Sequence, residues 1–142
     1  MSPNPEFLPS PEKENFPKKI FLICSVRGAT PEHRRELEEY TLQLERDGAI
    51  VHLPHRDTNQ CATGLEICEQ NFWAVVEADE VHIVYNPESQ GSHFDMGVAF
   101  ALGKPVVFVN EDQFPQEIKI TAKKSFPQML KQWQDNGVNR ED

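Results

Sequence analysis

The sequence lacks a surplus of positive charge. Its 142 residues include 14 Lys and Arg against 23 Asp and Glu, so the formal net charge is −9 at pH 7. Nucleic acid polymers are bound mainly through basic side chains that face phosphates, and anionic membrane surfaces attract basic segments in the same way. The composition therefore disfavours both a nucleic acid polymer and a membrane as partners.

Long apolar runs and cysteine pairs are also missing. No apolar run approaches the roughly 20 residues that cross a bilayer, and the first 19 residues contain no apolar segment typical of a secretory signal. The three cysteines form no CxxC pair (Cys24, Cys61 and Cys68). An odd, unpaired set is typical of a reduced, cytoplasmic protein and predicts neither a disulfide framework nor a zinc site. We expect no metal and no other cofactor.

Proline is concentrated at one end of the chain. Five of the 11 prolines lie in the first 17 residues. Proline removes backbone donors and blocks helix formation, so 1–17 is predicted to be an extended arm. The arm is either a solvated tail or a segment that packs along a neighbouring subunit. Residues 18–142 are predicted to form a single domain, which is close in size to a minimal nucleotide-binding α/β unit.

Within this domain, short apolar runs alternate with helical patterns. The predicted strands are 20–24, 50–53, 81–85 and 106–109, with 117–121 as a short fifth. Helices are predicted from Pro31 to Gly48, from Gly64, over 92–102, and from Ser125. On the third helix, apolar spacing predicts that four residues point inward (Phe94, Val98, Ala101 and Leu102). Alternating strands and helices predict an α/β fold: a small doubly wound sandwich around a parallel sheet of four or five strands, in the order 2-1-3-4-5.

Ligands of such sheets bind beyond the carboxyl ends of the strands, where the winding direction switches. Here these are the loops after the first and third strands. The first loop contains Ser25, Arg27 and Gly28, where an arginine and a helix start could bind a phosphate or carboxylate. The second is a polar stretch that leads into a helix (Ser89, Gly91, Ser92, His93 and Asp95). After the second strand, residues 55–57 either line the same crevice or form a solvated loop.

Several motifs over 18–109 together resemble the nucleoside 2-deoxyribosyltransferase-like superfamily, and particularly its 2′-deoxynucleoside 5′-phosphate N-hydrolase branch. The similarity lies in four blocks: Ser25-Val26-Arg27-Gly28, Glu69-Gln70-Asn71 with Ala78-Asp79, Ser89-x-Gly91-x-x-x-Asp95-x-Gly97, and Gly103-Lys104-Pro105. The resemblance implies an enzyme that cleaves the N-glycosidic bond between deoxyribose and base. It proceeds through a glycosyl-enzyme intermediate that water or a second base resolves. The resemblance also implies a dimer or larger homo-oligomer.

The same resemblance assigns roles to individual residues. Asp95 takes the position of the nucleophile, where the family has Glu, and Asn71 takes the position of the acid, where the family has Asp. Glu69 and His93 are further catalytic candidates that could compensate for these two changes. The sugar and phosphate would be bound by Ser25, Arg27, Gly28, Ser89, Gly91 and Ser92. The implied ligand is a nucleoside, a nucleotide or a sugar phosphate.

The sequence is also compatible with two other classes of protein. Asn71 cannot exchange a proton as an acid–base group, so the chain could be a nucleotide-binding sensor module that has lost the chemistry. It could also be another doubly wound protein. A receiver domain would place acidic residues after the first and third strands, where this chain has Cys24-Ser25 and Tyr85-Asn86, and a flavodoxin would need a loop richer in Ser and Thr after the first strand.

Overall fold

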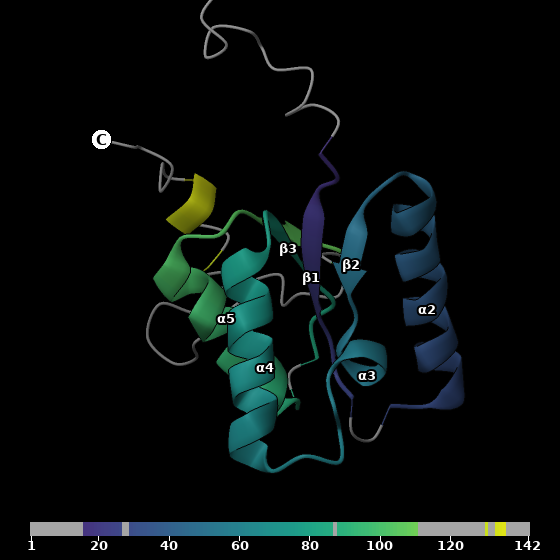
Figure 1. The fold of residues 1–142 in the computed structure, drawn as a ribbon, viewed down its shortest axis with the longest axis vertical. Helices are drawn as coiled ribbons and strands as arrows, with labels where there is room; N and C mark the ends of the chain where they lie inside the picture. Colours follow the sequence, from purple (N-terminus) through teal and green to yellow (C-terminus); the bar gives the residue numbers. More distant parts are fainter. Residues whose placement is uncertain (1–15, 27–28, 87, 111–129, 131–132, 136–142) are drawn as a thin grey trace, which may run out of the picture.

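A computed structural model describes residues 16–26, 29–86, 88–110, 130 and 133–135 (Figure 1). Its centre is a parallel sheet of four strands: β1 (Lys19–Ile23), β2 (Ile50–His52), β3 (Glu80–Ile83) and β4 (Val106–Phe108). The strand order is β2-β1-β3-β4, which confirms the predicted α/β fold and its winding. The predicted fifth strand, most of the arm and most of the last helix lie outside the described residues.

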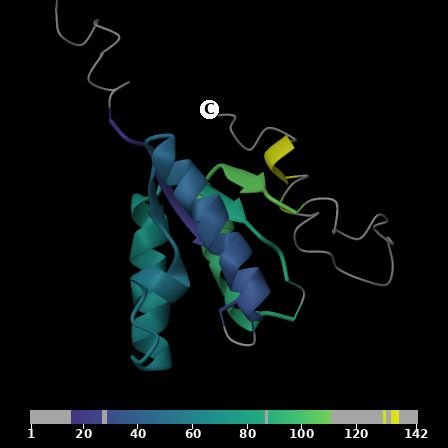
Figure 2. The same cartoon turned by 90° about the vertical axis from the view of Figure 1, so that its right-hand side faces the viewer.

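Helices cover both faces of the sheet (Figures 1 and 2). They are α2 (Pro31–Arg46), α3 (Pro54–Asp57), α4 (Gly64–Glu77) and α5 (Gln90–Leu102). Alternate residues of β1 point to opposite faces, as the pleat of a strand requires. Phe21 and Ile23 pack against α4 and α5, whereas Ile20 and Leu22 pack against α2. No helix of the described residues is long and apolar enough to span a membrane.

Two helices, α2 and α4, begin directly after a capping threonine. Thr30 caps α2 by accepting a hydrogen bond from the backbone N–H of His33, and Pro31 occupies the first turn. Thr63 and Glu66 form a capping box at the start of α4. Gly103 ends α5 with a left-handed φ of 67°, which glycine adopts without steric cost.

The inward face of α5 differs from the prediction. Phe94 and Leu102 are exposed, at 47% and 39%, and Ala101 is exposed as well. The buried residues are Ser92, Asp95, Met96 and Ala99. They follow helical spacing, but two of them are polar, so apolar periodicity was wrong for Phe94, Ala101 and Leu102. Val98 is half-buried and packs against the core, as predicted. The buried face of α5 therefore carries the carboxyl group of Asp95.

Lys104 and Asp79, which belong to the motif blocks of the sequence, make structural hydrogen bonds. The Lys104 ammonium donates hydrogen bonds of 2.8 Å to the carbonyls of Val76 and Ala78, where α4 ends. The Asp79 carboxylate accepts a hydrogen bond of 2.9 Å from the backbone N–H of Lys19, at the start of β1. Together they fix α4 against the segment after α5 and against the sheet. The positions of α4 and α5 matter because they carry Asn71 and Asp95.

Candidate active site

A cleft of about 690 Å³ lies beyond the carboxyl ends of β1 and β3, where the winding rule places a ligand. The segment after β1, the loop after β3 and the starts of α4 and α5 form its walls. The lining residues are Cys24, Ser25, Val26, Pro54, Gln60, Gly64, Ile67, Cys68, Asn71, Asn86, Glu88, Ser89, Gln90, Gly91 and Asp95. Their mixture of hydroxyl, amide and carboxyl groups suits a polar ligand of nucleoside size.

Asp95 and Asn71 meet in this cleft from two helices. Asp95 is 4% exposed and Asn71 is 8% exposed. The Asn71 amide Nδ2 lies 3.5 Å from Asp95 Oδ2, the limit of a hydrogen bond. Burial raises the pKa of Asp95 from 3.8 to about 7, while the hydrogen bond from Asn71 opposes this rise. Asp95 therefore holds its proton until near neutral pH, which is the range in which a carboxyl group can alternate between its two forms.

The beginning of α5 forms another wall of the cleft. Ser89 is the N-cap, and its Oγ accepts a hydrogen bond of 3.1 Å from the backbone N–H of Ser92. His93 lies within hydrogen-bond distance, 2.8 Å, of the Ser89 carbonyl through Nδ1, and its ring meets the ring of Tyr85 edge-on. These contacts order the loop before the helix. The first N–H groups of a helix have no partner within it, so Gln90 and Gly91 bring donors to the cleft.

The structure brings together five of the predicted site residues. Ser25, Asn71, Ser89, Gly91 and Asp95 all line the cleft.

The other predicted site residues do not line the cleft or lie outside the described residues. Glu69 is exposed on α4, and neither it nor His93 is among the described residues that line the cleft. Ser92 is 1% exposed, and its Oγ has no hydrogen-bond partner among the described residues. Arg27 and Gly28 lie outside the described residues.

The cleft also contains residues that sequence reasoning did not select. Glu88 is the second carboxyl group among its described lining residues, and Gln60, Cys24 and Cys68 line it too. Burial, reinforced by the charge of Asp95, raises the pKa of the Cys24 thiol to about 12. Cys24 is therefore a neutral wall of the cleft and not a nucleophile. The position of Glu88 in the polar loop after the third strand was the sequence feature that could have identified it as a site residue.

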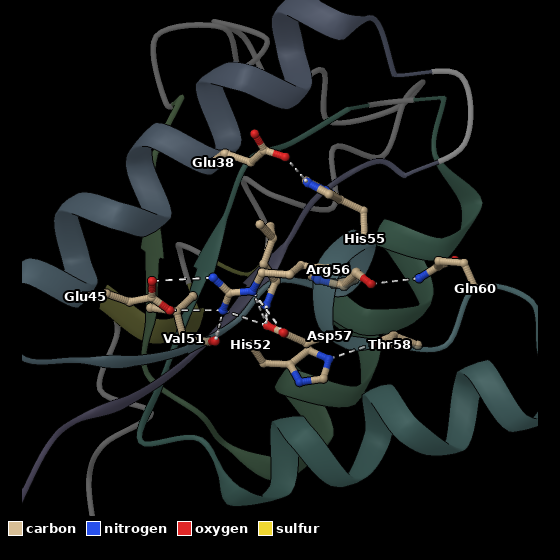
Figure 3. A network of polar contacts seen from close by, with 11 residues as sticks. Glu38, Glu45, Val51, His52, His55, Arg56, Asp57, Thr58 and Gln60 are labelled. Carbon is tan, nitrogen blue, oxygen red and sulfur yellow. Dashed lines mark hydrogen bonds and ion pairs between the residues drawn. The ribbon is translucent and has the colours of Figure 1, made fainter.

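The segment after β2 is an ordered turn, α3, and not an open loop (Figure 3). The Asp57 carboxylate accepts hydrogen bonds from the backbone N–H of Leu53, at 2.8 Å, and from the guanidinium of Arg56. Arg56 also donates to the Val51 carbonyl, at 2.8 Å, and to the Glu45 carboxylate, at 3.0 Å. Arg56 and Asp57 thus support the turn, and residues 55–57 are not among the described residues that line the cleft.

A second cavity, of about 430 Å³, adjoins the first on the side of α2. Ser25 and Asn86 line both cavities. The second cavity is bounded further by Thr30 and Tyr40 from the start and middle of α2 and by Asn110 after β4. Ser25 and Asn86 therefore lie between two cavities at the same edge of the sheet. Within the described part of the chain, no group of three or more His, Cys, Asp or Glu side chains could hold a metal ion.

The fold and the cleft define a doubly wound α/β protein with a buried carboxyl group at its ligand-binding edge. The sequence model of the nucleoside 2-deoxyribosyltransferase family matches residues 20–136. Because this match covers most of the sequence, the chain belongs to the nucleoside 2-deoxyribosyltransferase family. The solved structure of the CMP N-glycosidase BcmB from Clostridium botulinum is similar in fold, with a TM-score of 0.51 and 24% sequence identity over 64% of this chain and 70% of that chain. A search of curated proteins found no match.

Proposed function

We propose that this protein cleaves the N-glycosidic bond of a deoxynucleoside or its 5′-monophosphate, with Asp95 as the nucleophile. The observation that carries the proposal is the buried carboxyl group of Asp95, which lines a polar cleft in a chain of this family. Its pKa of about 7 supports the role. A carboxylate in a site of low polarity is poorly solvated, so it gains from forming a covalent bond.

The proposed reaction has two displacement steps. A carboxylate oxygen of Asp95 forms a bond to C1′ while the bond from C1′ to the base nitrogen breaks. The base nitrogen keeps the electron pair and takes up a proton. Water then forms a bond to C1′, the ester bond to Asp95 breaks, and the carboxylate is restored as the water loses a proton. If a second base replaces the water, the same intermediate gives transfer of the deoxyribosyl group.

The proton in these steps needs a donor other than Asn71, because a carboxamide is not an acid–base group. Glu88 is the remaining carboxyl group among the described residues that line the cleft. Its backbone N–H donates a hydrogen bond of 2.9 Å to the Asn86 side chain, which holds the turn that carries it. We assign to Glu88 the transfer of the proton to the leaving base and its recovery from water.

A 5′-phosphate fits the beginning of α5. The N-terminus of a helix carries partial positive charge, and its free N–H groups suit an anion. Gln90 and Gly91 supply such groups to the cleft, and the hydroxyl-bearing residues Ser25 and Ser89 line it as well. The sequence adds Arg27 after β1 as a positive charge that could bind the phosphate. These features support a 5′-monophosphate as the substrate that we propose to test first.

Base release measured by chromatography tests the proposal. Purified protein is incubated with each deoxynucleoside and each 5′-monophosphate, and free base is quantified over time. Asp95→Ala should lower the rate by at least about 10³-fold, because loss of a nucleophile removes the covalent route. The matched control is Glu39→Gln, which neutralises an exposed carboxylate on α2 and should leave the rate unchanged. Base release by Asp95→Ala at the wild-type rate would eliminate Asp95 as the nucleophile.

One observation favours a second candidate function, a nucleotide-binding sensor without turnover. The amide of Asn71 lies next to the carboxyl group of Asp95, at the place where the resemblance implies an acid. Thermal-shift measurements with nucleosides, nucleotides and sugar phosphates separate the two functions when they are paired with base release. Stabilisation by a nucleotide that is never cleaved would favour the sensor, whereas release of base from the same ligand would favour the enzyme.

A further inference from the structure

Behind Asp95, four side chains form a continuous row of polar contacts. His52 Nε2 lies 2.7 Å from Thr58 Oγ1, and the Thr58 hydroxyl lies 2.7 Å from Asn71 Oδ1. The Asn71 Nδ2 then lies 3.5 Å from Asp95 Oδ2. The row begins at the end of β2 and reaches the cleft through α4. His52 and Thr58 are not among the described residues that line the cleft, so they meet the ligand only through Asn71.

The chemistry of these groups fixes the direction of the hydrogen bonds. An ionised carboxylate only accepts hydrogen bonds, so Asn71 must present its NH₂ group to Asp95. The Asn71 carbonyl then faces Thr58 and accepts the single proton of the hydroxyl group. Because that proton is used, Thr58 Oγ1 can only accept from His52, which must carry a proton on Nε2. Each member therefore donates toward Asp95.

The first two members of the row are held firmly. The His52 ring stacks on Phe21 of β1, with centroids 5.2 Å apart and planes at 17°. Thr58 is 4% exposed, and its backbone N–H donates a hydrogen bond of 3.0 Å to the carbonyl of Pro54, the first residue of α3. The same turn is anchored by the network of Arg56 and Asp57 (Figure 3). The turn after β2 thus sets the position of the hydroxyl group that contacts Asn71.

We propose that His52 and Thr58 are positioning residues that hold the Asn71 amide with its NH₂ group toward Asp95. Without the Thr58 hydroxyl, the buried Asn71 carbonyl loses its donor and the amide is free to rotate. A rotated amide would place its oxygen against the Asp95 carboxylate, which repels it. The relevance of this arrangement to catalysis rests on the proposed function, whereas the arrangement itself does not.

The surrounding charges agree with this assignment. Burial lowers the pKa of His52, the nearby Asp57 acts in the opposite direction, and Arg56 lowers the pKa further. His52 is therefore neutral at neutral pH, and it has one N–H group to donate. Asp95 faces Cys24, which directly follows β1, and Asn71 of α4, and Asn71 is the partner that lowers its pKa. Asn71 must keep its orientation to stabilise the ionised form.

Two variants at one position test the proposal. Thr58→Val keeps the shape of the side chain but removes the hydroxyl group, and Thr58→Ser restores it. Carbon-13 NMR of the side-chain carboxyl groups, with the Asp95 signal identified by its loss in Asp95→Asn, gives the pKa of Asp95 in each protein. Thr58→Val should raise this pKa by about 0.5–1 unit, the equivalent of one hydrogen bond. Thr58→Ser should return it to the wild-type value, and the pH profile of kcat should shift in the same way.

Two further measurements on His52 test the proposal independently of Thr58→Val. Nitrogen-15 shifts of the His52 ring should show the proton on Nε2, and a proton on Nδ1 alone would contradict the direction of the row. If Thr58→Val does not fold, His52→Phe removes the first donor and keeps the stacking on Phe21, so it should also raise the Asp95 pKa. An unchanged Asp95 pKa in these variants, or equal shifts in Thr58→Val and Thr58→Ser, would overturn the proposal. Because the NMR titration needs no turnover, an inactive wild-type protein would count against the proposed function alone.

Discussion

The buried carboxyl group of Asp95 predicts an unusual dependence of stability on pH. Its pKa rises from 3.8 to about 7 on folding, because burial disfavours the charged form. The folded protein therefore binds the proton more tightly than the unfolded chain does. The free energy of unfolding contributed by this group is fully present below about pH 4 and is lost progressively as the pH rises to about 7. Above pH 7 the full cost of the buried charge remains, on the order of 4 kcal/mol at 1.36 kcal/mol per pKa unit.

Asp95→Asn removes this cost, because the new side chain has nearly the same shape and cannot ionise. Its oxygen can still accept the hydrogen bond from Asn71. The free energy of unfolding of the variant should exceed that of the wild type by about 1 kcal/mol at pH 4.5 and by about 4 kcal/mol at pH 8. Urea unfolding of both proteins at several pH values measures the difference. All other titrating groups are shared by the two proteins, so their contributions cancel in this difference.

The matched control for this series is Glu39→Gln, which removes a carboxylate from the exposed face of α2. Its difference from the wild type should stay small and independent of pH, since exposed charges contribute little to stability. A difference between Asp95→Asn and the wild type that is flat from pH 4.5 to pH 8 would refute the reasoning. It would mean that Asp95 titrates like an ordinary carboxyl group and that burial does not set its pKa.

Further predictions concern the helices, the thiols and the assembly. Gly97→Ala in α5 should raise the free energy of unfolding by about 1 kcal/mol, because an added Cβ meets no atom within 4 Å and alanine favours helix. Gly103→Ala should instead lower it by about 1–2 kcal/mol, because φ is 67° there. Thiol titration with an aromatic disulfide should modify exposed Cys61 rapidly and spare buried Cys24 in the folded protein, and equal rates would contradict the burial of Cys24. We also predict a dimer or larger homo-oligomer, which light scattering would refute by giving the mass of a monomer.

The elements and their winding could be predicted from the sequence because they depend on local patterns. Continuous apolar runs marked the buried strands, and Thr30 with Pro31 marked the start of α2. The inward face of α5 could not be predicted in the same way. Ser92 and Asp95 are polar and yet buried, and Asp95 lines the cleft, whereas apolar spacing favoured Phe94 and Leu102, which are exposed.

The candidate site was predicted in part, for a related reason. The winding rule and the motifs selected Ser25, Ser89 and Asp95, which lie at the ends of strands or the start of a helix. The connection of His52 and Thr58 to Asn71 depends on contacts between segments that are distant in sequence. No local pattern encodes such contacts, and the sequence predicted residues 55–57 either to line the crevice or to form a solvated loop, neither of which is the turn of α3.

The central claim is that Asp95 forms a covalent bond to the sugar. Rapid quenching of the protein during turnover of a deoxynucleoside 5′-monophosphate, followed by intact-mass measurement and peptide mapping, tests it most directly. We predict a mass increase equal to the substrate without its base, located on Asp95 within α5 and absent from Asp95→Asn. An adduct on a different residue, or base release by Asp95→Asn at the wild-type rate, would contradict the claim.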